Sequence, residues 1–318
     1  MSEIEFEFLP YFRSYKNGRV ERFFGTDVVP ASLGSETGVS SEDVTIVPEN
    51  TTAAAVSARL FIPSSITITP DRTPKPKPKP KLPLLIYFHG GAYMFGSPFC
   101  ATYHHYLTSV VASANVVAIS IDYRLAPEHP LPAAFEDSWD ALKWAASHSA
   151  GHGPEAWLNE YADFQRAFVA GDSAGSTIAH AMAVRAGEEE GLGGVKLVGL
   201  GVIHPDFASK KGGLSPTAAW NFACPATAGW DDPRINPAAD SRLSRLGCER
   251  VLICVAEFDE MKERGWLYYD VLKESGWKGK VEILETPGEG HAFHLFNPTC
   301  TNAVTLLKKL ASFLHQEE

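Results

Sequence analysis

Short, fully apolar runs alternate with amphipathic segments along most of the chain after about residue 84. Runs of Val, Ile, Leu and Ala without polar alternation are typical of parallel strands that are covered on both faces. Such strands are expected at Leu84–Phe88, Val116–Ile121, Phe168–Ala170, Leu197–Ile203, Val251–Val255 and Val281–Leu284. Their alternation with helical segments predicts a doubly wound α/β domain, with a mostly parallel central sheet flanked by helices.

Two of the intervening segments have a clear apolar face at helical spacing. The first face is expected to consist of Phe135, Trp139, Leu142 and Ala146, and the second of Val304, Leu307, Leu310, Ala311 and Leu314. Earlier in the chain, residues alternate between apolar and polar near Val44–Val47 and Val56–Phe61. This period of two predicts an antiparallel pair of strands at an edge of the sheet.

Three segments interrupt the pattern within what we expect to be one domain, residues 1–318. Residues 1–45 are aromatic and broken by Gly and Pro, so they pack over another part as a lid or as a structural wrap. The Pro/Lys repeat within 70–81 predicts an extended surface loop, with a recognition motif for a partner as the alternative. The irregular segment 206–245 is a candidate cap insertion or a plain connecting excursion.

The composition narrows the classes of partner. The 318 residues are 45% hydrophobic and 21% charged, with a net charge of −10, which argues against nucleic acid and against an anionic membrane surface. No apolar run approaches the roughly 20 residues that span a bilayer. The acidic N-terminus lacks a secretory pattern and the five cysteines are odd in number, so we expect a cytoplasmic protein with free thiols. The pattern does not decide between monomer and homodimer.

The stretch Gly171-Asp172-Ser173-Ala174-Gly175 follows a short apolar run and precedes a helical segment. A G-x-S-x-G turn between a strand and a helix is the context of a nucleophile elbow. Small flanking residues let the strand and the helix pass closely while the serine sits on a strained backbone. The pattern therefore predicts that Ser173 is a nucleophile and that the amide of Ala174 faces a developing oxyanion.

A second glycine-rich stretch, His89-Gly90-Gly91-Ala92, directly follows the expected strand Leu84–Phe88. Consecutive glycines after a strand let backbone amides converge on one point, as an oxyanion hole requires. An ordinary Gly-Gly turn is the alternative for this stretch alone. The elbow about 80 residues later favours the oxyanion hole.

A serine nucleophile needs a base, and the base needs a carboxylate that orients it. In this topology the chain order is serine, acid, histidine. Asp259 follows the strand Val251–Val255, and His291 lies in a loop after the next strand. Competing residues are Glu257 and Glu260 for the acid and His294 for the base. A metal site on His291 and His294 lacks a third ligand or an H-E-x-x-H pattern, so no metal is expected.

Together these stretches, with Asp122-Tyr123-Arg124-Leu125-Ala126-Pro127-Glu128-His129, resemble the plant carboxylesterases of the hormone-sensitive-lipase-like α/β-hydrolase group. The resemblance covers the chain from about residue 5 to its end. It implies a serine carboxylesterase without a cofactor, acting on a small ester of specialised metabolism. Its implied residues are the nucleophile Ser173, the base and acid His291, the orienting Asp259, and the oxyanion-hole residues Gly90, Gly91, Ala92 and Ala174. It also implies that the N-terminal segment forms part of a lid.

Two of the chain's departures from the family pattern concern the expected pocket. Ala92 stands where the family often has a third glycine, so its methyl group is expected to narrow the pocket. Asp206 stands where an aromatic residue is common, and it would favour a basic or polar substrate if it faces the pocket; a solvent-facing aspartate is the alternative. Tyr93 is a second candidate for lining the pocket.

Two other functions exist within the same group. Some members run eliminations or cyclisations on specialised metabolites, using the base and the oxyanion hole without an acyl-enzyme. The group also includes the gibberellin receptor, a binding protein in which the catalytic histidine is lost. The presence of Ser173 favours hydrolysis over a lyase, and the presence of His291 argues against a receptor.

Overall fold

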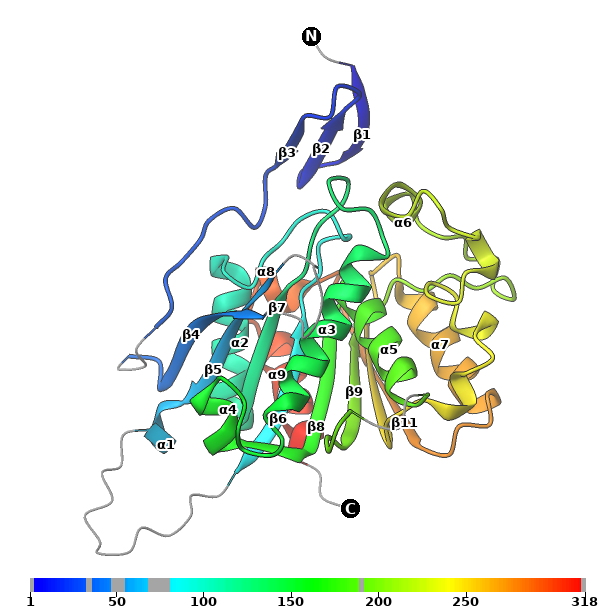
Figure 1. Cartoon of the computed structure of the whole chain (residues 1–318). Coiled ribbons are helices and arrows are strands. Elements are labelled where there is room, and N and C mark those ends of the chain that lie inside the picture. Colours follow the sequence, from blue (N-terminus) through cyan, green and yellow to red (C-terminus); the bar gives the residue numbers. More distant parts are fainter. Residues whose placement is uncertain (1–2, 33–35, 47–54, 68–80, 189–191, 316–318) are drawn as a thin grey trace, which may run out of the picture.

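An eight-stranded central sheet organises the molecule, in the order β11-β10-β9-β8-β6-β7-β5-β4 (Figure 1). The computed structural model describes residues 3–32, 36–46, 55–67, 81–188 and 192–315, so the predicted Pro/Lys loop lies outside the described residues except for Lys81. The strands of this sheet are β4 (Val39–Ile46), β5 (Val56–Pro63), β6 (Leu82–Phe88), β7 (Val117–Asp122), β8 (Ala162–Asp172), β9 (Leu197–Ile203), β10 (Arg250–Ala256) and β11 (Lys280–Thr286).

The strands from β6 to β11 pair in parallel, while β5 runs antiparallel to β7 and β4 runs antiparallel to β5. The predicted parallel sheet with an antiparallel pair at one edge is therefore confirmed. Because parallel strands share a direction, their carboxyl ends meet at one edge of the sheet, and open α/β sheets bind ligands there.

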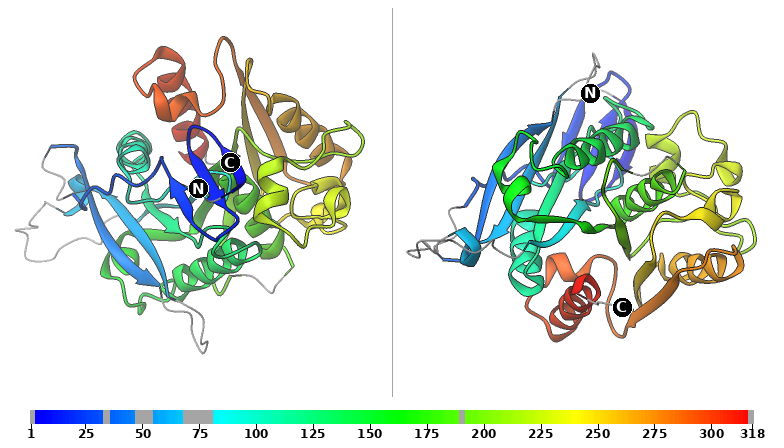
Figure 2. Two further views of the ribbon diagram at one scale, coloured as in Figure 1. Left: turned by 90° about the horizontal axis from the view of Figure 1, so that it is seen from above. Right: turned by 60° about the horizontal axis from the view of Figure 1, so that its bottom comes forward.

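Helices cover both faces of the sheet (Figure 2). Helices α2, α8 and α9 pack on one face, and α3, α5 and α7 pack on the other. The helices are α1 (Ser64–Thr67), α2 (Ala101–Ala114), α3 (Ala133–Ser147), α4 (Ala156–Tyr161), α5 (Ala174–Ala186), α6 (Ala218–Ala223), α7 (Lys262–Glu274), α8 (Phe293–Phe296) and α9 (Thr301–His315). None of these described helices has the length and apolar character needed to cross a bilayer.

The apolar runs divide between two cores, one on each face of the sheet. In β6, Leu84 and Ile86 join the core beneath α3, α5 and α7, whereas Leu85 and Tyr87 join the core beneath α2 and α9. Successive side chains of a strand point to opposite faces, so a strand covered on both faces must be apolar throughout. This explains the absence of polar alternation in the sequence.

The predicted face of α3 is confirmed, because all four of its residues are buried. The predicted face of α9 is partly wrong, since Val304 is 36% exposed and Leu307 is only half-buried. The helix instead buries Ala303, Leu306, Leu310, Ala311, Phe313 and Leu314. The predicted face included Val304 and Leu307, and it left out Ala303, Leu306 and Phe313, which the helix buries.

The N-terminal segment forms a small antiparallel sheet of β1 (Ile4–Phe8), β2 (Phe12–Tyr15) and β3 (Val20–Arg22). It stands beyond the carboxyl edge of the central sheet (Figure 1). Phe12 is fully buried, and the ring of Phe6 stacks on that of Phe222 with centroids 4.4 Å apart. The segment therefore packs over residues that belong to the 206–245 insertion.

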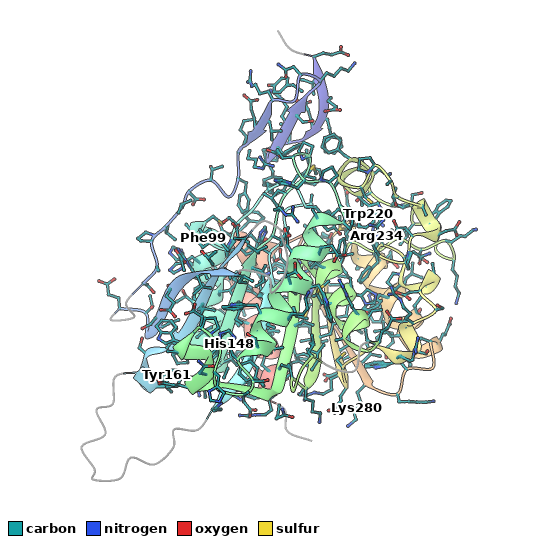
Figure 3. The ribbon with its side chains drawn as sticks, viewed as in Figure 1. Phe99, His148, Tyr161, Trp220, Arg234 and Lys280 are labelled. Atoms are coloured by element: carbon teal, nitrogen blue, oxygen red, sulfur yellow. The ribbon has the colours of Figure 1, made fainter. Side chains whose placement is uncertain are left out.

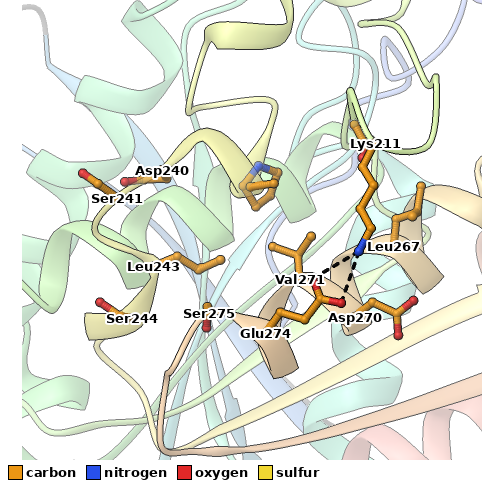
Figure 4. A pocket seen from close by; sticks show the side chains of 13 residues that line it. Lys211, Asp240, Ser241, Leu243, Ser244, Leu267, Asp270, Val271, Glu274 and Ser275 are labelled. Carbon is orange, nitrogen blue, oxygen red and sulfur yellow. Dashed lines mark hydrogen bonds and ion pairs between the residues drawn. The ribbon is translucent and has the colours of Figure 1, made fainter.

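The insertion 206–245 contains α6 and three short 3₁₀ turns, η1 (Gly229–Asp231), η2 (Pro237–Ala239) and η3 (Leu243–Arg245). Within the insertion, the guanidinium of Arg234 lies 5.7 Å from the ring centroid of Trp220 in α6 (Figure 3). This contact connects the part of the insertion around α6 with the part that follows η1. Where the insertion meets α7 it leaves a groove of about 340 Å³, flanked by the Lys211–Glu274 ion pair (Figure 4). No residue of the predicted triad lines this groove.

A buried arginine stabilises the antiparallel edge of the sheet. The side chain of Arg59 in β5 is 0% exposed, and its Nε and Nη2 donate to Asp43 in β4 at 2.6 and 2.9 Å. Nη2 also donates to the carbonyl of Val29, and Nη1 lies 3.1 Å from Nδ1 of His104 in α2. Because the guanidinium is completely desolvated, its partners must supply all of its stabilisation.

We expect Asp43→Asn to lower the free energy of unfolding by about 3 kcal/mol, because it leaves a buried guanidinium without its counter-charge. The control is Asp163→Asn, which removes the partner of the more exposed Arg166 and should cost less than about 1 kcal/mol. Urea unfolding followed by tryptophan fluorescence measures both. Equal losses in the two variants would contradict this account of Arg59.

Candidate active site

The turn Gly171–Gly175 joins the end of β8 to the start of α5. Ser173 has φ 51° and ψ −122°, a strained conformation for a residue with a side chain. A Cβ on Gly175 would lie 2.1 Å from the carbonyl oxygen of Phe88, and one on Gly171 would lie 2.3 Å from that of Gly175. Only glycine fits at these two positions, which explains the spacing of the motif around the serine.

Ser173, His291 and Asp259 lie in one hydrogen-bonded chain. Nε2 of His291 is 3.0 Å from Oγ of Ser173, and Nδ1 of His291 is 2.8 Å from Oδ2 of Asp259. The other carboxylate oxygen of Asp259 accepts from the amide of Met261 at 2.8 Å. The three residues follow β8, β11 and β10, so the carboxyl edge of the sheet brings them together from distant parts of the sequence.

The competing residues lie elsewhere or serve other purposes. Glu257 accepts a hydrogen bond from the amide of Gly288, and Glu260 is exposed. His294 is buried, and neither of its ring nitrogens hydrogen-bonds to any described residue. Within the described part of the chain, Asp259 is thus the carboxylate in contact with His291.

The environment of His291 makes it a stronger base. Burial lowers the pKa of His291, but the hydrogen bond from His291 to Asp259 and the charge of Asp259 outweigh burial, so the pKa lies above 6.5. Burial raises the pKa of Asp259, yet the same pair holds that carboxyl below its usual value. The hydrogen bond to Asp259 and the negative charge of Asp259 both stabilise the imidazolium that forms if His291 accepts a proton from Ser173.

We expect kcat/KM for a neutral ester to rise with pH along an acid limb whose midpoint lies above pH 6.5. His291 must be neutral to accept a proton, and its raised pKa keeps it protonated to a higher pH than an isolated histidine. Initial rates between pH 5 and 9 measure the limb. A midpoint below pH 6 would contradict the arrangement.

Besides Asp259, the charged and titratable groups that influence His291 are Asp172 and Asp206, which raise its pKa, and the buried histidines His204 and His294.

Three backbone amides of the two glycine-rich stretches have no hydrogen-bond acceptor among the described residues. The amides of Gly91, Ala92 and Ala174 donate to no acceptor among the residues that the structure describes. The amide of Gly90 does not belong with them, because it donates to the hydroxyl of Tyr103 at 2.8 Å and to Asp172 at 3.0 Å. Gly90, which the sequence analysis placed among the oxyanion-hole residues, therefore supplies no free amide, since a buried carboxylate already accepts from it.

The loop conformation after β6 fixes the direction of the first free amide. Gly91 has φ 114°, and a Cβ there would lie 1.9 Å from the carbonyl oxygen of Phe95, so only glycine fits. Nδ1 of His89 lies 2.7 Å from the carbonyl oxygen of Gly90. In a trans peptide that carbonyl and the amide of Gly91 point in opposite directions within one plane. The contact of the buried His89 ring with that carbonyl therefore helps to orient the Gly91 amide.

The other two free amides are fixed in the same way. The carbonyl of Gly91 accepts from the amides of Met94 and Phe95 at 2.9 and 3.0 Å, which orients the amide of Ala92. The carbonyl of Ser173 accepts from the amide of Ser176 at 3.0 Å, and this orients the amide of Ala174, the first residue of α5. Donors that are fixed before the reaction need no reorganisation when charge develops.

Asp206 and Tyr93, the two predicted pocket residues, are both buried. Asp206 is only 4% exposed, so the solvent-facing alternative is wrong. Its Oδ2 accepts from Thr217 at 2.9 Å, while Oδ1 lies 3.7 Å from Nη1 of Arg264 and accepts no hydrogen bond from the described residues. The Tyr93 hydroxyl likewise has no described partner, and its ring packs against Trp220 of the insertion.

His204, at the end of β9, is a site residue that the sequence analysis missed. It has φ 48°, and its Nδ1 accepts from the amide of Ala292 at 3.0 Å, next to His291. It therefore holds the loop that carries His291. The only sequence signal was a histidine directly after an apolar strand, which is a common arrangement.

A set of potential metal ligands within the described residues overlaps the triad. Single ligand atoms of His204, Asp259 and His291 lie within 4.8 Å of one another. Binding a cation there would take the ligand atoms that form the His291–Asp259 hydrogen bond. The arrangement thus fits an acid–base pair better than a metal centre, and we propose no metal for it.

Comparison with known proteins gives a consistent result at the level of sequence. Residues 85–295 match the family described as alpha/beta hydrolase fold. Probable carboxylesterases 5 and 7 of Arabidopsis thaliana are 45% and 43% identical to the chain, covering 98% and 99% of it and 99% of each relative. The 2-hydroxyisoflavanone dehydratase of Glycyrrhiza echinata is 42% identical, covering 98% of the chain and 96% of that protein.

Solved structures show the same architecture. An esterase of Pyrobaculum calidifontis is similar with a TM-score of 0.66 and 27% identity, over 86% of this chain and 84% of that one. A thermostable esterase from Pseudomonas putida reaches a TM-score of 0.69 at 22% identity, over 88% and 85% of the two chains. At that identity the second likeness concerns the fold alone.

Proposed function

The chain belongs to the α/β-hydrolase fold family and to its plant carboxylesterase group, and from this premise we propose that it hydrolyses small carboxylic esters through an acyl-enzyme on Ser173. The observation that carries the proposal is the hydrogen-bonded chain Asp259–His291–Ser173 beside three free amides. A nucleophile, a base with its orienting acid, and oxyanion donors are the parts that acyl transfer needs.

In the first half of the reaction, Oγ of Ser173 attacks the ester carbonyl while Nε2 of His291 takes its proton. Asp259 stabilises the imidazolium that forms. The amides of Gly91, Ala92 and Ala174 hold the oxyanion of the tetrahedral intermediate, each contributing about 3 kcal/mol to the transition state. His291 then gives its proton to the leaving alcohol, and the acyl group stays on the serine.

In the second half, water replaces the alcohol. His291 accepts a proton from the water as it attacks the acyl carbonyl, and the same three amides hold the second oxyanion. Collapse of this intermediate returns the proton to Oγ of Ser173 and releases the acid. Bonds and protons balance without a cofactor, and the proposal includes none.

We propose that the N-terminal segment 1–45 and the insertion 206–245 together cover the site. Tyr11 stacks on Phe95 of the oxyanion loop and on Phe296 of α8, which directly follows the His291 loop. Arg22 donates to the carbonyl of Met94 at 2.6 Å. These contacts support a lid role for the segment, because they connect it to the oxyanion loop and to the helix that follows the His291 loop.

Asp206 and Tyr93 are proposed to set the polarity of the covered pocket. Both are buried between the sheet edge and the insertion, and each carries an oxygen without a hydrogen-bond partner among the described residues. These oxygens have almost no exposed surface, so they make the wall beneath the insertion polar without facing solvent. The substrate is thus expected to be a small molecule with a polar group near the ester.

The direct test is hydrolysis of p-nitrophenyl acetate, butyrate and decanoate by the full-length chain. We expect saturable turnover that is fastest with the shorter acyl groups, because a covered pocket limits the size of the substrate. Ser109→Ala, which removes an exposed serine on α2, is the control and should keep full turnover. Rates no faster than the reaction in buffer for all three esters would contradict the proposal.

A second candidate is a lyase, favoured by the 42% identity to a 2-hydroxyisoflavanone dehydratase. Elimination of water from a β-hydroxy ketone needs the base His291 and the oxyanion donors but no nucleophile. The two functions therefore differ in their response to Ser173→Ala. Dehydration that survives this substitution, in a wild type inactive on esters, would favour the lyase.

The compartment and the oligomeric state remain predictions. All five cysteines are free thiols, four of them buried, which supports the proposed reducing, cytoplasmic environment. Sedimentation of the purified chain would distinguish a monomer from a homodimer.

A further inference from the structure

The residue before the proposed nucleophile is a buried carboxylate. Asp172 is 1% exposed, and both of its carboxylate oxygens accept hydrogen bonds. Oδ1 accepts from the hydroxyl of Tyr87 at 2.8 Å and from the amide of Gly90 at 3.0 Å, and Oδ2 accepts from the hydroxyl of Tyr103 at 2.9 Å. The hydroxyl of Tyr103 in turn accepts from the Gly90 amide at 2.8 Å.

This carboxylate connects two parts of the site that are far apart in the sequence. Along the chain it directly precedes Ser173, and through space it holds Gly90, which directly precedes Gly91. A Cβ on Gly90 would lie 2.4 Å from Oδ2 of Asp172, so the close approach requires glycine at that position. One side chain therefore links the turn of the nucleophile to the loop that carries the oxyanion donors.

We propose that Asp172 is a positioning residue whose buried carboxylate holds Gly90 and thereby aims the amides of Gly91 and Ala92 at the oxyanion that forms beside Ser173. This inference rests on the proposed esterase function and adds a residue to it that does not touch the substrate. Misplacement of reacting groups by about 1 Å can cost a factor of about 10² in rate. Loss of this positioning is therefore expected to lower kcat substantially.

The charge of Asp172 acts in the opposite direction to its positioning effect. A buried negative charge near a developing oxyanion destabilises it, since both carry the same sign. The sign of the change on removing the charge therefore decides which effect is larger. If Asp172 acted mainly through its charge on the oxyanion, removing it would raise kcat; if it acts by positioning, kcat falls.

The negative charge of Asp172 also affects the pKa of His291. Asp172 is among the carboxylates that raise the pKa of His291, after Asp259. Burial raises the pKa of Asp172 itself, while its hydroxyl and amide donors stabilise the ionised form. The other groups that influence Asp172 or border its cluster are Tyr87, Tyr103, Tyr106 and Tyr123, whose pKa values burial raises, and His89, whose pKa burial lowers to about 4.

The test compares Asp172→Asn with wild type on p-nitrophenyl acetate. We expect kcat to fall by a factor between about 10 and 10², with KM nearly unchanged. The inhibition constant of a trifluoromethyl ketone, whose adduct with serine places an oxyanion on the same amides, should rise by the same factor as kcat/KM falls. The acid limb of kcat/KM should also move to lower pH, because the loss of a negative charge lowers the pKa of His291.

Tyr103→Phe separates positioning from charge. It removes the hydroxyl between Gly90 and Asp172 but leaves the carboxylate in place. We expect kcat to fall and the trifluoromethyl ketone to bind more weakly, while the acid limb stays where it is in wild type. The matched control is Ser109→Ala on the same helix, whose exposed hydroxyl donates to the carbonyl of His105 and whose loss should change none of these quantities.

The outcomes distinguish this inference from the function on which it rests. An inactive wild type would contradict the proposed function itself. An active wild type whose Asp172→Asn variant keeps or increases kcat, or loses activity with no change in ketone inhibition, would overturn the positioning role. If Asp172→Asn does not fold, as judged by circular dichroism, the decision passes to Tyr103→Phe, and an unchanged kcat there would overturn the role as well.

Discussion

Replacing Ser173 by alanine is expected to lower kcat for p-nitrophenyl acetate by about 10⁴-fold or more, because no other group can form the acyl-enzyme. The hydroxyl oxygen is the only heavy atom removed, and alanine keeps the Cβ that the strained turn already accommodates. The fold and the thermal unfolding midpoint should therefore remain close to those of wild type. What turnover is left would come from substrate binding and from the three free amides.

The control for this variant is Ser109→Ala, which should keep full turnover because that serine is exposed on α2. Steady-state assays with both variants, together with circular dichroism, separate loss of chemistry from loss of structure. Turnover of the Ser173→Ala variant at a tenth or more of the wild-type rate would refute Ser173 as the nucleophile.

Asp259→Asn is expected to lower kcat by about 10⁴-fold with little change in KM, because an amide cannot hold His291 in the tautomer that accepts a proton from serine. Nδ1 of His291 lies 2.8 Å from Oδ2 of Asp259. An asparagine oxygen in that place still accepts a hydrogen bond, but it lacks the charge that stabilises the imidazolium. A rotated amide would instead donate to Nδ1 and leave the proton on Nε2, where the base is needed.

Glu260→Gln is the matched control for this variant. It removes a negative charge one residue away, but Glu260 is exposed and hydrogen-bonds to neither His291 nor Ser173. Steady-state assays should show wild-type kcat for Glu260→Gln. Comparable losses in the two variants would mean that general negative charge, and not the contact with His291, is what the reaction requires.

The elbow was predictable because its constraints are local. The clashes that a Cβ would make at Gly171 and Gly175 involve backbone atoms of the turn itself and of the adjacent strand β6. Those constraints appear in the sequence as small residues at fixed spacing around Ser173. The positions of Asp259 and His291 followed from topology, because parallel strands end at one edge of the sheet.

The occupied amide of Gly90 was not predictable from its own stretch of sequence. A Gly-Gly pair after a strand offers several amides, and which of them remain free depends on what else accepts from them. Here the acceptors are Asp172 and Tyr103, which lie 82 and 13 residues away along the chain. Competition between distant partners leaves no local pattern.

The structure differs from the sequence analysis at strand β1 and at Asp206, for two separate reasons. The strand β1, Ile4–Phe8, alternates apolar and acidic residues, so a period of two was present and passed over because Gly and Pro interrupt the segment soon afterwards. The burial of Asp206 is a tertiary effect, since Thr217 and Arg264 reach it from the insertion and from α7. Only the first of these could have been read from the sequence.

The most direct test of the central claim is to identify the residue that becomes covalently modified. Brief treatment of the full-length chain with diethyl p-nitrophenyl phosphate, followed by intact-mass and peptide mass spectrometry, should show one diethylphosphoryl group on the peptide that contains Ser173. The Ser173→Ala variant should remain unmodified under the same conditions. Modification of another residue, or an equal extent of labelling in the variant, would contradict a mechanism that runs through Ser173.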